Sequence, residues 1–558
     1  MGKKRNETLP NLATETIVQI FKDLDFHSLH SCALVNRYLC QVAIPMLWME
    51  PFENIYKETI TLTGGRSLKN MYLTKSIKKL SLLVDTYINC LPEESKFKLT
   101  NAGIVGFYKT KYPNYDYPSF LQSLDIISLF LGCRAWLGIR FKYKLASSVE
   151  TSLLLHQIRI LFFELCKLFM SQSMDIKGLY LINKKFSEEL ECGEKCDDHC
   201  LKNCLINRVI NPIVNQIPDL PGASKCLTKL ECLGTDDNTP IEFLQKISYS
   251  CKEIKNLIFA PGFVNIDDKI SILSSQNHLK YLILQGYLYD YSPETRQVFE
   301  KIFKYLEWLT IDGRYILPIK KLNSFENLVA LEVVSKYQCY NQSYDIFKLL
   351  ANVEFPKLQY LLVDIGISYF KLWSLIISKT TNLKKIVLHW NHRLVQDYVG
   401  FVDLTSSIIN HCPNLIILKM NWINNYSESI NYLLEIFKHC VKLEYFGILN
   451  SGIFDEDYYL PLLGNNLPPN LRVLKHLNVP IYYSVESLEL FFRSASNRLN
   501  APLNIDLNLF PGHEHSKIAQ DYFFTGLINP AFTKFDYDKR LDYYRCNLRY
   551  FILLFMID

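Results

Sequence analysis

The chain has 558 residues, of which 49% are hydrophobic and 21% are charged. This length is several times the usual domain length of roughly 100–200 residues, and the composition is that of a folded protein rather than a disordered one. The net charge of +5 is spread over the whole chain, whereas nucleic-acid-binding proteins usually concentrate basic residues on one face. We therefore expect several domains or one long repeat array, and no nucleic-acid partner.

The first predicted elements are three short helices between Leu12 and Trp48. Thr14 is a candidate N-cap for the first helix, and the apolar residues that follow it recur at helical spacing. The second helix is expected over about residues 28–35 and the third over about 36–47. These helices carry more apolar positions than so small a unit can bury. We expect the surplus to form a partner site.

This segment resembles an F-box, whose motif begins L-P-x-E-x-L-x-x-I, continues through V-(C/N)-(R/K) and closes with L-W. The chain has "LATETIVQI", then "DFHSLHSCALVNRYL", then "PMLW". It departs from the motif at Ala13, where the family has proline, and at Phe26, where it has leucine. The resemblance implies that an adaptor-binding surface is formed by Leu12, Glu15, Ile17, Ile20, Phe21, Leu24, Leu29, Leu34, Val35, Asn36, Arg37, Leu47 and Trp48. The alternative is that the same helices only cap the end of a repeat array.

The F-box resemblance also implies a role. Proteins of that family bind a Skp-type adaptor, which connects them to a cullin–RING ubiquitin ligase, while a second domain holds the substrate. Such a subunit does no chemistry and needs no cofactor. It raises the effective concentration of substrate lysines near the ubiquitin-charged enzyme.

A six-residue pattern of the form L-x-x-L-x-L recurs through the body of the chain, with its copies after residue 227 roughly 22 to 32 residues apart. In this pattern the last two apolar positions point inward from a short strand and the first fills the turn before it, so each unit needs its neighbours to bury its face. The copies begin at Ile77, Ile176, Leu227, Ile254, Leu279, Leu306, Leu328, Leu358, Leu383, Leu415, Leu443 and Leu471.

The spacing predicts a solenoid of strand, turn and helix, which resembles an irregular leucine-rich-repeat array. Together with the resemblance of the N-terminal segment to an F-box, this implies an α/β fold in which a three-helix F-box precedes the solenoid. We expect a flexible tail over residues 1–10, a helical module over 11–55, the solenoid over 56–510 and a C-terminal cap over 511–558. Two or three eroded repeats are expected between Ile77 and Ile176. A generic α/β protein with leucine-rich strands is the alternative.

Two stretches invite other interpretations. The segment Ser152–Phe169 is apolar, but four polar residues interrupt it, so it predicts a buried amphipathic helix rather than a membrane span. The run Arg140–Lys144 alternates charged and apolar residues, as a half-exposed strand does. The repeat pattern breaks after about Pro511, and we expect His513 and His515 of "PGHEHS" to lie in a turn between the solenoid and its cap.

Four cysteines recur every four residues: Cys192, Cys196, Cys200 and Cys204. On one helix the outer two would be about 18 Å apart at 1.5 Å per residue, so one zinc ion with bonds of about 2.3 Å cannot reach all four unless the segment folds back. We interpret residues 186–208 as a cysteine-rich insertion, with metal binding and redox sensing as alternatives. The other cysteines are scattered singly among apolar residues, which is typical of a reducing compartment.

The preferred hypothesis is a non-catalytic substrate receptor of an SCF-type (Skp adaptor, cullin, RING) ubiquitin ligase. The alternative is a leucine-rich interaction scaffold with no ubiquitin role. No secretory signal or membrane span is evident in the sequence, so we expect a cytoplasmic or nuclear protein. No motif identifies the protein substrate.

Overall fold

The computed structural model describes residues 13–52, 55, 69–105, 113–141, 148–182, 209–236, 238–260, 266–284, 292–312, 325–334, 343–364, 369–390, 397–422, 429–448, 456–476, 484–505 and 513–528. The chain divides into two compact units, the first running to Ile254 and the second beginning at Lys255. Each unit combines helices with parallel strands. Within the described residues, no helix combines the length and the apolar character needed to cross a bilayer.

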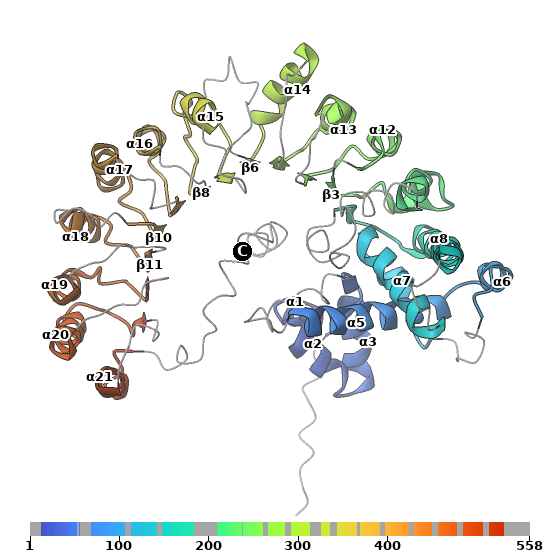
Figure 1. The fold of residues 1–558 in the computed structure, drawn as a ribbon, viewed down its shortest axis with the longest axis horizontal. Coiled ribbons are helices and arrows are strands. Elements are labelled where there is room, and N and C mark those ends of the chain that lie inside the picture. Colours follow the sequence, from blue (N-terminus) through green and yellow to red (C-terminus); the bar gives the residue numbers. More distant parts are fainter. Residues whose placement is uncertain are drawn as a thin grey trace, which may run out of the picture. The chain divides into compact units, whose positions relative to one another are not determined.

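The first unit consists mainly of helices (Figure 1). Its helices are α1 (Thr14–Lys22), α2 (Phe26–Ala33), α3 (Arg37–Leu47), α5 (Lys69–Asn89), α6 (Glu93–Asn101), η2 (Tyr117–Phe120), α7 (Ile126–Phe141), α8 (Ser148–Gln172), α10 (Asn211–Val214), η4 (Ile217–Asp219), α11 (Ala223–Cys226) and α12 (Ile241–Ser250). Its strands are β1 (Ser123–Asp125), β2 (Gly178–Tyr180) and β3 (Cys232–Thr235), which pair in parallel in that order.

The three predicted N-terminal helices are present as α1, α2 and α3. The N-cap of α1 is Ala13 rather than the predicted Thr14, and Ala13 offers no side-chain oxygen to the first turn. The side chain of Asp25 caps α2 by accepting a hydrogen bond from the backbone N–H of Ser28 at 2.7 Å. Asn36 caps α3 in the same way, through the N–H of Leu39 at 2.8 Å. These two caps explain why the segment folds as separate short helices.

The predicted strand at Ile77 is wrong, because this copy of the six-residue pattern lies inside helix α5. Leu80 within the hexamer is buried, and the buried apolar residues continue beyond it as Leu83, Val84, Tyr87 and Ile88. That spacing has a helical period, and it prevails over the six-residue match. Instead of two or three eroded repeats, the described residues between Ile77 and Ile176 form four α-helices, the short 3-10 helix η2 and the single strand β1.

Two further expectations for this unit have opposite outcomes. The predicted amphipathic helix over Ser152–Phe169 is confirmed as part of α8, with Arg159 exposed and Leu161 and Leu165 fully buried. The predicted strand beginning at Arg140 is wrong, because Arg140 and Phe141 form the last turn of α7. Arg140 there stacks on Trp136, with 5.0 Å from its guanidinium carbon to the ring centroid, so its alternation with apolar residues reflects a helix end.

The second unit alternates strands with helices. Its strands are β4 (Asn256–Phe259), β5 (Tyr281–Leu284), β6 (Trp308–Asp312), β7 (Ala330–Val334), β8 (Tyr360–Asp364), β9 (Lys385–His389), β10 (Ile417–Met420), β11 (Tyr445–Ile448), β12 (Val473–His476) and β13 (Asn504–Ile505). Its helices are η5 (Ile266–Lys269), α13 (Ile270–Ser274), α14 (Pro293–Phe303), α15 (Ser343–Leu350), α16 (Phe370–Ser378), α17 (Tyr398–His411), α18 (Ser429–His439), α19 (Glu456–Asn466), α20 (Val485–Ser496) and α21 (His513–Phe524).

These strands pair in parallel, each with the next along the chain. The helices of this unit all lie on the same side of the strands (Figure 1). We call the opposite side of the strands the inner face. Every copy of the six-residue pattern from Ile254 to Leu471 overlaps one of these strands. Its first residue is buried in the turn before the strand, as Leu279, Leu383 and Leu443 illustrate.

A row of polar side chains joins the turns that precede the strands. Asn382 donates from its amide to the carbonyl of Pro356 at 3.2 Å, and Asn470 donates to the carbonyl of Val441 at 3.0 Å. Asn327 makes the equivalent bond to Lys304 at 2.8 Å. In each case the asparagine precedes the first leucine of its hexamer and bonds to the preceding unit. These bonds satisfy turn carbonyls that would otherwise lack a protein donor.

Beyond the predicted boundary at residue 510 the chain continues with helix α21 and an isolated parallel bridge to Leu503. Leu503 pairs in parallel with Ile528, and His513 and His515 lie in the first turn of helix α21 rather than in a turn between domains. The strand–helix alternation therefore continues to at least Ile528. The sequence pattern was lost because β13 spans two residues, too few to show a period. The rest of the predicted C-terminal cap, like the predicted tail over residues 1–10, lies outside the described residues.

Candidate functional site

The N-terminal module, residues 13–52, has its own small core. Ile17 and Phe21 from α1, Leu29 from α2 and Leu47 from α3 pack together with Val42 and Ala43. Four of the predicted adaptor-binding residues, Ile17, Phe21, Leu29 and Leu47, are therefore core residues of the module itself. Leu24 is half-buried and packs against the same core. These side chains shape the module rather than present a surface.

The end of α3 is fixed to the rest of the first unit. The ring of Trp48 lies 4.1 Å from that of Tyr117 and 5.6 Å from that of Tyr87, centroid to centroid. One residue later, the carbonyl of Met49 accepts hydrogen bonds from the backbone N–H groups of Gln122 at 2.9 Å and Ser123 at 3.1 Å. Trp48, predicted as an adaptor contact, thus joins the module to the segment that enters β1.

The apolar surface that remains lies where α2 meets α3. Leu34 is 76% exposed, Val35 61% and Tyr38 42%. Leu34 and Val35 are consecutive in the turn between the two helices, and Tyr38 follows within the first turn of α3. On α1, Ile20 is 47% exposed. Large apolar side chains with this exposure, gathered in a module of some forty residues, are typical of a docking surface.

Of the polar residues predicted to contact the adaptor, one caps a helix of the module and two are exposed on its surface. Asn36 is engaged as the N-cap of α3, so it orients Val35 and Tyr38 on either side of it. Glu15 and Arg37 are exposed. The pKa of Asp25 is lowered, chiefly because its carboxylate accepts the backbone hydrogen bond of Ser28. The remaining predicted residue, Leu12, lies outside the described residues.

The inner face of the second unit carries a buried polar chain that sequence reasoning missed. The indole N–H of Trp308 donates to Oγ1 of Thr310 at 3.1 Å, and Thr310 donates to Oε2 of Glu332 at 2.8 Å. Glu332 is 3% exposed, and this burial raises its pKa to about 7. Burial also lowers the pKa of Lys385, two strands away, to about 8, against the opposing attraction of Glu332.

The raised pKa of Glu332 makes a prediction about pH. From about pH 4.5 to about pH 7 the folded protein holds a proton on Glu332 that the unfolded chain, with a pKa of 4.5, has released. The free energy of unfolding should therefore fall as pH rises through this range. The variant Glu332→Gln should show a smaller fall, measured by urea denaturation at a series of pH values. Identical pH profiles for the two proteins would contradict this placement of the carboxyl group.

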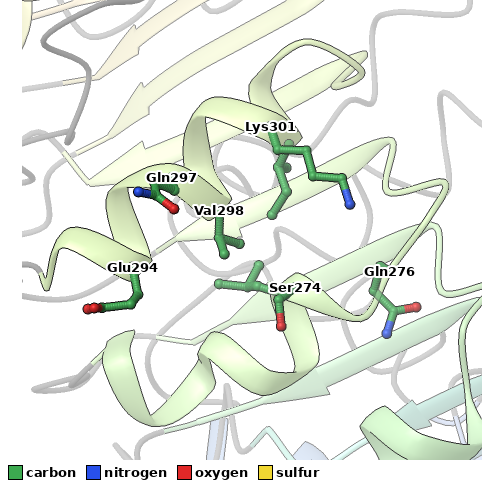
Figure 2. Close-up of a pocket in the computed structure, with 8 residues that line it drawn as sticks. Ser274, Gln276, Glu294, Gln297, Val298 and Lys301 are labelled. Atoms are coloured by element: carbon green, nitrogen blue, oxygen red, sulfur yellow. The ribbon is translucent and has the colours of Figure 1, made fainter.

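A cleft of about 400 Å³ opens between α13 and α14 on the helical side of the second unit (Figure 2). It exists because α13 spans only five residues and cannot cover the neighbouring eleven-residue helix α14. Polar side chains, among them Ser274, Glu294 and Lys301, line its edge, and Val298 lies between them (Figure 2). The lining contains neither histidine nor cysteine.

Seven of the ten cysteines that the structure describes are buried. Cys440 donates from its thiol to the carbonyl of Cys412 at 3.4 Å, and Cys251 donates to that of Leu227 at 3.1 Å. Burial raises the pKa of the Cys440 thiol to about 12, which makes it a poor nucleophile. Within the described ranges, no group of histidine, cysteine or carboxylate side chains could hold a metal ion. Cys192, Cys196, Cys200 and Cys204 lie outside those ranges.

Comparison with known proteins bears on the N-terminal module. Residues 9–54 match the family described as F-box-like. This range includes helices α1, α2 and α3 and Trp48. No curated protein matches the chain. The match supports an F-box protein, and domains of this family are typically non-catalytic and bind Skp-type adaptors.

Proposed function

We propose that the chain is the substrate-recognition subunit of an SCF-type ubiquitin ligase. The observation that carries this proposal is the exposure of four large apolar side chains, Ile20, Leu34, Val35 and Tyr38, within the segment that matches the F-box-like family. An F-box protein needs such a surface to bind a Skp-type adaptor, and the adaptor then connects it to a cullin and a RING protein.

In this proposal the strand–helix units are leucine-rich repeats and their inner face holds the substrate protein. The parallel strands place one side chain from each unit side by side, so a bound segment can contact several units at once. The protein does no chemistry and holds no cofactor. It keeps the substrate near the ubiquitin-charged enzyme and so raises the local concentration of reacting lysines.

The proposal also places the protein in the cytoplasm or the nucleus. In support, the ten cysteines within the described residues form no disulfide with one another. Disulfides are rare in those compartments because thiols are kept reduced there. A leucine-rich scaffold with no ubiquitin role would have the same reduced thiols. Binding to a Skp-type adaptor therefore distinguishes the two functions.

Co-expression of the full chain with a Skp-type adaptor tests the proposal. We expect the wild-type chain to retain the adaptor through affinity purification. The variant Val35→Asp should retain at least about tenfold less, because an unpaired carboxylate would be buried in an apolar contact. The variant Leu490→Asp serves as the matched control, since Leu490, like Val35, is an exposed branched aliphatic side chain but lies on α20 in the second unit.

Three outcomes are informative. Loss of the adaptor with Val35→Asp but not with Leu490→Asp supports docking through the N-terminal module. Equal retention by both variants would show that this surface is not the docking site. If the wild-type chain itself retains no adaptor, the ligase function is lost and the scaffold function takes its place.

A further inference from the structure

The cleft between α13 and α14 combines apolar lining with charged ends. Leu273 of α13 and Ile302 of α14 line it as buried residues, and Val298 of α14 is half-buried. Glu294 lies toward one end of the cleft and Lys301 toward the other (Figure 2). A cleft of about 400 Å³ can take up a few side chains of a partner. Its lining therefore fits a protein surface that has an apolar centre between two opposite charges.

The exposed residues that α14 contributes to the cleft form one stripe along the helix, which we call the α14 stripe. It consists of Glu294, Gln297, Val298 and Lys301, at positions i, i+3, i+4 and i+7, which share one face of a helix. The strands are covered by another face of α14, where Phe299 is fully buried. At 1.5 Å per residue, the two charged residues are about 10 Å apart along the helix axis. They leave the centre of the stripe open between them.

The two charges of the α14 stripe are available to a partner. Both side chains are exposed, and neither forms an ion pair or a side-chain hydrogen bond within the part of the chain that the structure describes. Glu294 in the first turn and Lys301 in the last turn also complement the helix dipole. The dipole accounts for the order of the charges, but it does not account for the open cleft that lies beside them.

The α14 stripe is complementary to itself when it is turned end to end. A second α14 that lies antiparallel, centred between Gln297 and Val298, brings each Glu294 carboxylate beside the Lys301 ammonium of the other copy. The two Val298 side chains then lie near the twofold axis, next to the cleft. A twofold dimer requires a contact of this kind, because the same patch has to serve both subunits. A partner of another sequence would have to supply the reversed order of charges independently.

We propose that the α14 stripe and the cleft beside it bind the same surface of a second copy of this chain, in a symmetric dimer. Exposed ion pairs contribute little to affinity and the cleft is small. We therefore expect a weak dimer, with a dissociation constant of about 10–100 µM. The inference does not depend on the ligase function. Within the ligase proposed above, such a dimer would carry two N-terminal modules and two inner faces.

Sedimentation velocity of the purified full chain, at about 1 to 200 µM and without any adaptor, tests the inference. We expect the wild-type chain to shift from monomer to dimer as its concentration rises, and the shift to weaken in high salt. Glu294→Lys and Lys301→Glu each place like charges opposite one another at both ends of the contact. Each variant should therefore weaken the dimer at least about tenfold.

Mixing the two variants identifies the partner as a second copy. In an equimolar mixture of Glu294→Lys and Lys301→Glu, one chain carries two lysines in the stripe and the other carries two glutamates. Every contact between unlike chains then joins opposite charges, so the mixture should dimerise within about threefold of wild type. The double variant, with both substitutions in one chain, should dimerise similarly because its reversed stripe is again self-complementary.

The matched controls make the same charge changes at the same places in other helices. Glu486→Lys lies in the first turn of α20 and Lys438→Glu in the last turn of α18. Both lose the same interaction with a helix dipole, and both should dimerise as the wild-type chain does. Circular dichroism of every variant checks that the helices are retained.

The inference is overturned if the wild-type chain stays monomeric up to 200 µM, if the single variants dimerise as tightly as wild type, or if their mixture stays monomeric. It is also overturned if the control variants weaken the dimer as much as the stripe variants do. Adaptor retention is measured on separate samples. A monomer that retains the adaptor removes this inference and leaves the proposed function, and a dimer that retains no adaptor does the converse.

Discussion

Replacing Phe370 by alanine is expected to lower the free energy of unfolding of the second unit by about 3–5 kcal/mol. Phe370 begins α16 and is fully buried. Its ring centroid lies 5.0 Å from that of Trp390, 5.6 Å from that of Trp373 and 5.8 Å from that of Phe401. These rings come from α16, from the residue that follows β9 and from α17, so the cavity left by alanine would disrupt the contact between neighbouring strand–helix units.

Urea denaturation followed by tryptophan fluorescence measures this effect, because four of the six tryptophans, Trp308, Trp373, Trp390 and Trp422, lie in the second unit. The matched control is Phe524→Ala, whose side chain is 80% exposed on α21. That variant should change the free energy by less than about 0.5 kcal/mol. A loss below about 1 kcal/mol for Phe370→Ala would contradict the packing described for this cluster.

Replacing Gly222 by alanine should destabilise the first unit by roughly 3 kcal/mol. Gly222 has φ of +86°, a conformation that costs an alanine about 1–2 kcal/mol. An added Cβ would also lie 2.3 Å from the carbonyl oxygen of Met170 and 2.9 Å from Cα of Ser171. Both are backbone atoms at the end of α8, so relief requires a shift of that helix, at a further cost of about 1–3 kcal/mol.

A second glycine of the same unit separates the two contributions. Gly103 has φ of +75°, but a Cβ there would meet nothing closer than Nε2 of Gln157 at 3.4 Å. Gly103→Ala should therefore show the conformational cost alone. Hydrogen exchange of the α8 amides measures both variants, since slowly exchanging amides report the stability of the unit around them. Equal effects of the two substitutions would mean that Gly222 does not approach α8 as closely as described.

The six-residue pattern predicted the strands of the second unit well because each unit repeats the same burial requirement. Leu279 and Leu383, for example, both fill the turn before a strand and are buried there. A single copy of the pattern would carry little weight, but copies in neighbouring units support one another. The pattern failed at Ile77, where the same residues belong to a longer helical period in α5. It also missed β1 and β13, which span three and two residues and are too short for a period to appear.

The candidate site was harder to predict than the fold. The family resemblance located the right segment but did not separate residues that face inward from those that face outward. Phe21 and Leu29 belong to the core of the N-terminal module, and Trp48 connects that module to the rest of the first unit. Leu34 and Val35 are exposed. That division depends on packing partners such as Tyr87 and Tyr117, which are distant in sequence.

The central claim is that the turn between α2 and α3 docks a Skp-type adaptor. Calorimetric titration of purified adaptor into the full chain tests it most directly. We predict a measurable dissociation constant for the wild-type chain, and binding at least about 100-fold weaker for the double variant Leu34→Asp, Val35→Asp, with an unchanged circular dichroism spectrum. Absence of binding by the wild-type chain, or equal affinity for both proteins, would contradict the claim.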